Sequence, residues 1–516
     1  MKIERTKNAA RNIFFGVLLK LYTTLIPFIM RTAMIYFMGV QYLGLNGLFT
    51  SVLSVLNLAE LGVGSAMVYS MYKPIVVDDA RSICALMRLY RTYYRIIGLI
   101  IAVIGLCLTP FVPKLITGAL PAQINIYTLY LLNLSATVLS YWLFAYRNCL
   151  FSAHQRGDMI SKIAMAADTI KYVCQLYVIT VLHNYYCYVI VALCTQIMSN
   201  IITAIASRRM FPTYKPEGKL EELEVKRINK RISDLFTSKI GAVVVNSVDT
   251  IVISAFLGLS MLGIYQNYFF IMTSIIGMIE IIFKACTAGI GNSVIVESGD
   301  KNFNDLKKLT FIISWISGFC VCCFACLYQP FMELWVGKRF MLNFSAVVCL
   351  CVYFYIYEIN RLLNTYKDAA GIWHADRFRP LATAGANLTM NLIMVQFWGI
   401  YGIILSTVLS MLIVGMPWLI QNLFSTIFQR ELLKSYVVQL LQYVFIAAVI
   451  SSITYILSGF VRGQLVFQLI GKGIICVAVP NVCFWMIYKN KKEYAEMLII
   501  IERMTHGKIS FRRAIK

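Results

Sequence analysis

Charged and polar side chains lie inside stretches of this sequence that are otherwise apolar and long enough to cross a bilayer. In the first stretch, Lys20, Thr24, Pro27 and Arg31 follow one another at offsets of 4, 7 and 11 residues. Eleven residues make about three helical turns plus 20°, so these side chains share one helix face. Pro27 removes a backbone hydrogen bond and is expected to bend that helix. Two cations on one face of a bent helix suit an anion; the alternative for Lys20 is that it extends to the cytoplasmic interface.

A weak copy of this region recurs 219 residues later in the chain. Without a gap, the shift places Lys20 on Lys239, Gly39 on Gly258 and Gly44 on Gly263. Internal repeats of this kind are common in transporters. The sequence therefore predicts a duplicated membrane protein.

The chemistry of the copy differs from that of the first stretch. Lys239, Asn246 and Asp249 lie close to one stripe of the predicted seventh span, and Thr250 stands where the first copy has Arg31. Lys239, like Lys20, has interfacial placement as its alternative.

Carboxylates occur in three further spans. Glu60 lies in the second span, near Asn57. Glu280 and Lys284 are one turn apart in the eighth span, and a structural pair is the alternative to a substrate contact there. In the fifth span Asp168 and Lys171 are spaced i,i+3, and we interpret them as a local pair.

Composition indicates what kind of chain holds these groups. Hydrophobic residues make up 59% of the 516 residues and charged residues 14%, against about 25% charged in soluble domains. The apolar runs reach the ~20 residues that a membrane helix needs, and they lack the short alternation of barrel strands. We predict an all-α polytopic membrane protein with about fourteen transmembrane helices, arranged as two pseudo-symmetric six-helix bundles plus two C-terminal helices.

The positions of the basic residues predict the topology. Of the lysines and arginines in connecting segments, only Lys114, Lys338, Arg339 and Arg462 fall on the side of the membrane opposite the N-terminus. This asymmetry predicts that both termini are cytoplasmic. The net charge of +23 then reflects orientation and contact with anionic headgroups, and no nucleic-acid partner is expected.

The predicted organisation follows from these spans. The expected parts are an N-terminal six-helix bundle (1–207), a basic cytoplasmic linker with a possible amphipathic helix (208–232), a C-terminal six-helix bundle (233–427), two extra transmembrane helices (428–488) and a basic cytoplasmic tail (489–516).

Patterns typical of catalysis or cofactor binding are missing. The four histidines are scattered, and neither an HExxH nor a GxxxxGK[ST] motif occurs. Cys323 and Cys326 have metal-ligand spacing but no second pair, so we interpret them as packing residues. We therefore expect a transporter rather than an enzyme, with no cofactor and no metal site.

Four segments resemble a known family. Gly39–Phe49, Ala59–Ala66, Tyr72–Pro74 and Asn246–Ile253 are similar to the polysaccharide-export branch of the multidrug/oligosaccharidyl-lipid/polysaccharide (MOP) flippases, which is related to the MATE transporters. The resemblance implies a central cavity between two bundles, lined by spans one, two, seven and eight. It also implies a bacterial cytoplasmic membrane location and a substrate made of an oligosaccharide on undecaprenyl pyrophosphate, flipped by alternating access for surface polysaccharide synthesis.

The resemblance assigns roles to the polar residues described above. The predicted substrate-binding residues are Lys20, Arg31, Asn57, Glu60, Asn246, Asp249 and Lys284. The predicted candidates for coupling to Na⁺ or H⁺ are Glu60, Asp249 and Glu280. Partners implied by the family are the lipid-linked oligosaccharide, membrane lipids, and the polysaccharide polymerase and glycosyltransferases of the same process.

Two alternatives remain at this stage. A cation-coupled multidrug exporter of the MATE type would use Asp249 or Glu60 as its ion site, but Arg31 would be unfavourable beside a cationic drug, and such chains usually stop near twelve spans. A membrane-embedded sugar polymerase or acyltransferase would need a large extracytoplasmic loop or a buried His/Asp cluster, and the sequence has neither.

Overall fold

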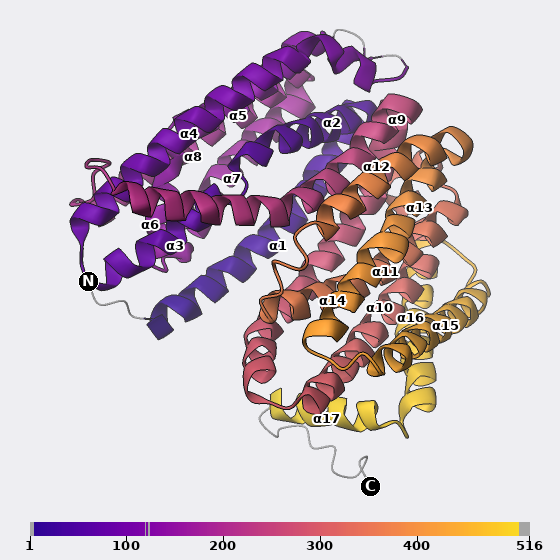
Figure 1. Cartoon of the computed structure of the whole chain (residues 1–516). Coiled ribbons are helices and arrows are strands. Elements are labelled where there is room, and N and C mark those ends of the chain that lie inside the picture. The colour runs from indigo at the N-terminus through magenta and orange to yellow at the C-terminus, as the bar shows by residue number, and fades with distance from the viewer. Residues whose placement is uncertain (1–4, 119, 122–123, 505–516) are drawn as a thin grey trace. The chain divides into compact units, whose positions relative to one another are not determined.

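The computed structural model describes residues 5–118, 120–121 and 124–504, and these form helices and connections without a strand. They divide into two compact units, Met1–Gln266 and Asn267–Lys516 (Figure 1). The all-α fold class predicted from the sequence is confirmed. The bundle boundary placed in the linker 208–232 stays a prediction.

The first unit is built from eight α-helices and the first part of a ninth. Its helices are α1 (Arg5–Phe37), α2 (Val40–Leu56), α3 (Val63–Val76), α4 (Ala80–Leu108), α5 (Ile126–Trp142), α6 (Asn148–Ala153), α7 (Gly157–Tyr177), α8 (Tyr185–Met210) and the start of α9 (Glu222–Val296). Polar side chains cap several of them: the Asp79 carboxylate accepts a hydrogen bond from the Ser82 backbone N–H, and Asn125 does the same at the start of α5.

Glycines break the second predicted span and separate it from the first. Met38 and Gly39, the latter with φ at 114°, separate α1 from α2, so the corner between the two spans is only two residues long. After α2 the chain tightens into the 3₁₀ turn η1 (Asn57–Glu60), and Gly62 adopts a left-handed conformation with φ at 90°. A residue with a side chain is strained at such positive φ values. The break places Asn57 and Glu60 at a helix interruption.

The repeat predicted from the sequence recurs in the backbone. Gly258, the counterpart of Gly39, has φ at 85° and interrupts α9 in the same way. Within the first unit, a Cβ on Gly44 would overlap the carbonyl oxygen of Leu259, and a Cβ on Gly263 would overlap that of Val40. Both glycines therefore allow two backbones to approach closely.

The second unit contains the end of α9 and the remaining helices. These are α10 (Gly299–Val336), α11 (Phe344–Ala369), α12 (Arg379–Trp398), α13 (Ile400–Ser410), α14 (Met416–Thr426), α15 (Leu432–Ser458), α16 (Leu465–Tyr488) and α17 (Lys492–Met504). A π-helical turn, η6 (Met411–Gly415), joins α13 to α14.

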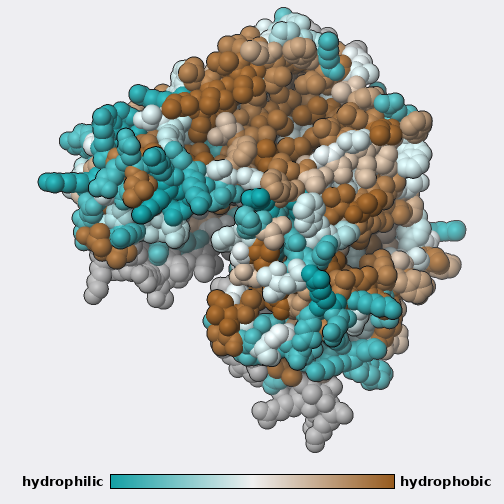
Figure 2. Space-filling view, in the orientation of Figure 1, coloured by the Kyte–Doolittle hydropathy of each residue, from teal (hydrophilic) through white to brown (hydrophobic). Residues whose placement is uncertain are grey.

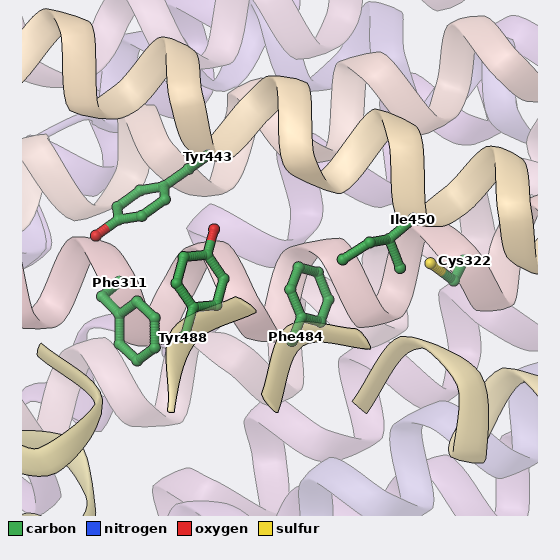
Figure 3. Close-up of a cluster of buried hydrophobic side chains, with 6 residues drawn as sticks. All are labelled: Phe311, Cys322, Tyr443, Ile450, Phe484 and Tyr488. Carbon is green, nitrogen blue, oxygen red and sulfur yellow. The ribbon is translucent and has the colours of Figure 1, made fainter. Parts of the chain in front are cut away.

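The two C-terminal helices α15 and α16 pack against α10. Figure 3 shows the buried cluster that joins the three helices, and it consists of Phe311, Cys322, Tyr443, Ile450, Phe484 and Tyr488. Apolar burial of this kind stabilises by roughly 25 cal/mol per Å². The predicted extra spans are thus attached to the second unit through α10.

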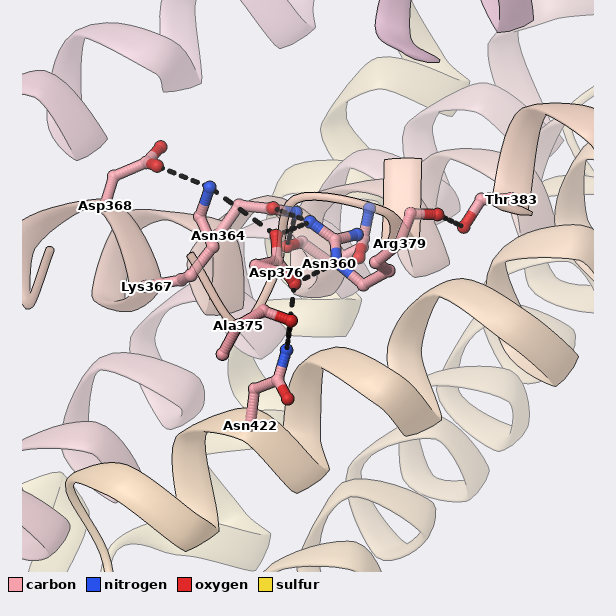
Figure 4. Close-up of polar contacts among 9 residues, drawn as sticks. All are labelled: Asn360, Asn364, Lys367, Asp368, Ala375, Asp376, Arg379, Thr383 and Asn422. Carbon is pink, nitrogen blue, oxygen red and sulfur yellow. Dashed lines mark hydrogen bonds and ion pairs between the residues drawn. The ribbon is translucent and has the colours of Figure 1, made fainter. Parts of the chain in front are cut away.

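A buried carboxylate fixes the connection between α11 and α12. Asp376 is 2% exposed and accepts hydrogen bonds from Arg379 Nε at 2.6 Å and from Asn422 at 3.2 Å (Figure 4). The ammonium group of Lys367 lies 3.7 Å from the same carboxylate. This network ties α11, α12 and α14 together.

Among the described residues, eleven helical segments are long and apolar enough to cross a membrane, and a bent pair, Ile126–Trp142 with Ala145–Ala153, would make twelve. The difference from the predicted fourteen has two sources. One segment, Val243–Val296, has 54 residues, or about 80 Å of helix, which is long enough for two spans that meet near Gly258. The other is α12, which is not among the segments that are apolar enough to cross a membrane.

Apolar side chains cover much of the surface. Figure 2 shows hydrophobic residues gathered over wide areas of the visible face. Leu99, Phe397 and Phe445 are 56%, 77% and 69% exposed. Large exposed apolar areas of this kind suit contact with lipid. The chain is a multi-pass membrane protein.

Candidate functional site

A polar cavity of about 530 Å³ lies inside the first unit, among α1, α2, α5, α7 and α8. Its lining includes two cations, several amides and several hydroxyl groups. The residues with polar side chains are Arg31, Asn46, Asn57, Asn133, Thr137, Ser140, Lys171, Tyr172, Gln175, Tyr188 and Gln196. Such a concentration of polar groups within membrane-spanning helices marks a candidate binding site.

Arg31 and Lys171 supply the positive charge of the cavity. Arg31 comes from α1, one turn after Pro27, and its guanidinium remains charged at any physiological pH. Lys171 comes from α7, and its ammonium group forms an ion pair of 2.5 Å with Asp168 and lies 4.5 Å from the ring centroid of Tyr172. No carboxylate is among the described residues that line the cavity. The lining therefore favours an anionic ligand.

Neutral polar groups complete the wall. The Oδ1 atom of Asn57 is buried and accepts no hydrogen bond from the described residues. Gln175 donates to the Tyr188 carbonyl at 3.1 Å, and Asn133 donates to the Leu129 carbonyl at 2.9 Å. A buried amide oxygen without a donor costs free energy, which a ligand hydroxyl would recover. The wall can thus accept hydrogen bonds from a polyhydroxylated ligand as well as hold an anion.

Glu60 lies beside the cavity but its carboxylate is already engaged. Tyr94 donates to one carboxylate oxygen at 2.5 Å, and Tyr141 donates to the other at 2.8 Å. Tyr90 in turn donates to the Tyr94 hydroxyl at 2.6 Å. The interrupted helix after Asn57 is thereby tied to α4 and α5. The predicted roles of Glu60 in substrate binding and in coupling stay predictions.

Of the other residues predicted for the first unit, those whose side chains are described are not in the cavity lining. Lys20 is on an exposed part of α1, and Asp249 is 9% exposed on α9. The side chains of Lys239 and Asn246 lie outside the part of the chain whose side chains are described. The structure therefore brings together Arg31 and Asn57 from the predicted set, and Lys171 joins them.

Glu280 and Lys284 form their ion pair in the second unit. The distance from the Lys284 ammonium to Glu280 Oε1 is 3.0 Å, and the Arg361 guanidinium on α11 lies 2.8 Å from the same oxygen. The Lys284 side chain is 74% exposed, so its pair contributes little to stability. Glu280 is thus an acceptor for two cations, one of which the sequence did not indicate.

Sequence reasoning missed the walls that α5, α7 and α8 contribute. Two i,i+4 pairs carry a signal that could have identified them: Asn133 with Thr137 on α5, and Lys171 with Gln175 on α7. Amides and hydroxyls at this spacing share one helix face. Lys171 had been assigned to a local pair with Asp168, which does form.

Comparison with known proteins places the fold. No protein-family model matches the chain, and no curated protein matches it in sequence. The structure is similar to that of the lipid II flippase MurJ in an inward-closed conformation, with a TM-score of 0.68, 13% sequence identity, and coverage of 93% of this chain and 99% of that one. The two structures therefore share their fold.

Two further MOP-superfamily structures are similar. An inward-facing multidrug-resistance MATE transporter gives a TM-score of 0.57 at 14% identity, over 78% of this chain and 97% of that one. A transporter from Pyrococcus furiosus, reported to have a binding pocket of reversed polarity, gives 0.51 at 14% identity, over 82% and 96%. Likeness at this level of identity concerns the fold, and the ligand must be argued from the residues of this chain.

Proposed function

We propose that this protein is a flippase for lipid-linked oligosaccharides, which moves undecaprenyl-pyrophosphate-linked repeat units across the bacterial cytoplasmic membrane for surface polysaccharide synthesis. Transport would follow alternating access, as expected for duplicated transporters. The fold shared with a lipid II flippase is compatible with this proposal. It does not by itself select the substrate.

The observation that carries the proposal is the cavity in the first unit. Arg31 and Lys171 supply positive charge, and Arg31 can bind two phosphate oxygens at once. Asn57, Asn133 and Gln175 offer amide groups of the kind that bind sugar hydroxyls. A pyrophosphate joined to an oligosaccharide has both features, whereas its polyprenyl chain can remain in lipid.

A MATE-type drug exporter is the second candidate, because the fold is also similar to that of a MATE transporter. Most drugs of that class are cationic, and a cavity whose described lining includes Arg31 and Lys171 but no carboxylate would repel them. The carboxylate of Glu60, which a cation would need, accepts two tyrosine hydroxyls. The cavity thus favours the flippase.

The experiment uses a bacterial strain that lacks its own repeat-unit flippase. Expression of this chain should restore surface polysaccharide and reduce the lipid-linked repeat units that accumulate inside the cell. Because substrate mismatch would also prevent rescue, a panel of strains with different repeat units should be tested, together with binding of undecaprenyl pyrophosphate to the purified protein. Absence of rescue in every strain and of binding, with a gain in resistance to cationic dyes, would replace the flippase with the drug exporter.

A further inference from the structure

Glu358 is a fully buried carboxyl group in the second unit, on α11. Its side chain is 0% exposed. Neither of its two carboxyl oxygens forms a hydrogen bond with any described residue. Sequence analysis did not single it out, although an ionisable residue inside a span is itself a signal.

Its depth makes the ionised form costly. At 1.5 Å per residue, Glu358 lies about 21 Å along the helix from Phe344 and about 17 Å from Ala369, near the middle of α11. An ionised carboxylate buried there without hydrogen bonds would lose its hydration without replacement. The arrangement of the side chain therefore favours a neutral, protonated carboxyl group.

The charged and titratable groups around Glu358 come from three helices. They are Glu280 and Lys284 on α9, Cys320 on α10, and Tyr355, Tyr357 and Arg361 on α11. The segments α13, η6 and α14, which also pack on α11, contain no Asp, Glu, Lys, Arg or His. Arg361 is thus the cation one turn from Glu358, and Glu280 holds it at 2.8 Å.

We propose that Glu358 is a proton-binding site and that Arg361 is the cation that stabilises it when the proton leaves. The proposed resting state has an intact carboxyl O–H bond on Glu358, and Arg361 pairs with Glu280. When that O–H bond breaks, the proton passes to water and the carboxylate keeps the electron pair. The new negative charge then competes with Glu280 for the Arg361 guanidinium.

The movement of Arg361 from Glu280 to Glu358 costs little free energy at Glu280. Lys284 already lies 3.0 Å from the same oxygen of Glu280, so this carboxylate keeps a cation when Arg361 turns toward Glu358. One arginine shared by two carboxylates converts proton loss into a change of the contact between α9 and α11. Use of this change to drive transport rests on the proposed function; proton binding itself does not.

Infrared difference spectroscopy of the purified full chain in lipid nanodiscs tests proton binding without any transport. Raising the pH from about 5 to about 9 should remove a carboxylic-acid carbonyl band that is absent from Glu358→Gln. Glu358→Asp should retain the band at a shifted frequency. Glu333→Gln is the matched control and should leave the band unchanged, because it changes a partly exposed glutamate near the end of the neighbouring α10, where it pairs with Lys338.

Three results would overturn the proposal. They are persistence of the same band in Glu358→Gln, absence of any titrating acid band in the wild type, and loss of the band on addition of sodium at constant pH, which would assign the site to sodium. The use in coupling is tested separately, in proteoliposomes with a pH-sensitive dye. Substrate-dependent proton movement should occur with the wild type and fall at least about tenfold in Glu358→Gln. A titrating Glu358 without transport of any lipid-linked oligosaccharide would leave the proton site standing and remove the proposed function.

Discussion

Gly44 and Gly263 are related by the internal repeat, and each lies against the backbone of the other's copy. The carbonyl oxygen of Leu259 occupies the place of a Cβ on Gly44, and that of Val40 occupies the place of a Cβ on Gly263. Val40 and Leu259 are themselves 219 residues apart, as are the two glycines. The contact is therefore reciprocal, as expected where two copies of a duplicated hairpin meet around a pseudo-two-fold axis.

The first prediction concerns this close approach. Gly44→Ala and Gly263→Ala should each destabilise the protein by about 1–3 kcal/mol, because backbone has to move to admit the methyl group. Unfolding in mixed micelles would measure the effect. The control is Gly16→Ala on α1, where a Cβ would meet nothing within 4 Å and alanine should be neutral or slightly stabilising. Equal stability of all three variants would contradict the close approach.

The sequence predicted the helical fold and the repeat because both depend on local features. Long apolar runs specify spans, and glycines at Gly39 and Gly258 mark the helix breaks. The cavity was predicted only in part. Arg31 and Asn57 were identifiable as polar residues in apolar helices, but the residue pattern along one helix does not indicate which other helices pack against that helix.

Contacts between helices explain what was missed. Tyr94 and Tyr141 both donate hydrogen bonds to Glu60, and no spacing in the sequence links them to it because they come from two other helices. Likewise, Arg361 on α11 pairs with Glu280 on α9. The spacing of residues along the sequence indicated only Lys284, which is one helical turn from Glu280. Such pairings require the tertiary arrangement.

The second prediction concerns Arg31 in the cavity. Arg31→Ala should reduce export of repeat units by about 30-fold or more while membrane abundance stays normal, because a charge-assisted bond to an anion is worth roughly 2–3 kcal/mol. Arg31→Lys should retain part of the activity if charge alone matters and lose most of it if the planar guanidinium binds two phosphate oxygens. Surface glycan and immunoblots are the measurements.

A matched control for Arg31 is Arg209→Ala, which removes an exposed cation at the end of α8 that does not line the cavity. Its export should equal that of the wild type. If Arg31→Ala also exported normally, Arg31 would not belong to the substrate site.

The third prediction concerns the tyrosines that hold Glu60. Tyr141→Phe and Glu60→Gln should each lower the free energy of unfolding by about 1–2 kcal/mol, because each removes or weakens a buried hydrogen bond to a charged group. In the double variant the two losses should not add, with a coupling of about 1 kcal/mol. Strict additivity would show that the Tyr141–Glu60 contact does not contribute to stability.

The fourth prediction concerns the cap of α4. Hydrogen bonds from the Ser82 hydroxyl and backbone N–H hold the pKa of Asp79 below its ordinary value. A depressed pKa in the folded state means that the ionised cap stabilises the protein above the unfolded-state value of about 3.9, and that this contribution is lost as the pH falls through the folded-state pKa. The difference in melting temperature between wild type and Asp79→Ala should therefore be present at neutral pH and shrink in strong acid. A difference independent of pH would exclude this role of the carboxylate.

The fifth prediction compares two carboxylates that share Lys367. Figure 4 shows Lys367 paired with both Asp368 and Asp376. The ammonium lies 2.6 Å from Asp368 and 3.7 Å from Asp376, but the Asp368 side chain is 56% exposed and that of Asp376 is 2% exposed. Only Asp376 also binds Arg379, at 2.6 Å. Burial, more than proximity to the lysine, should therefore decide which of the two matters.

Asp376→Ala should cost about 3–5 kcal/mol, since it leaves the buried Arg379 guanidinium without its carboxylate. Asp368→Ala should cost less than about 1 kcal/mol, because its ion pair is exposed to solvent and screened by salt. Unfolding measured at low and high salt distinguishes the two effects, with the smaller one vanishing at high salt. Equal costs for the two variants would mean that the network in Figure 4 is not what holds α11, α12 and α14 together.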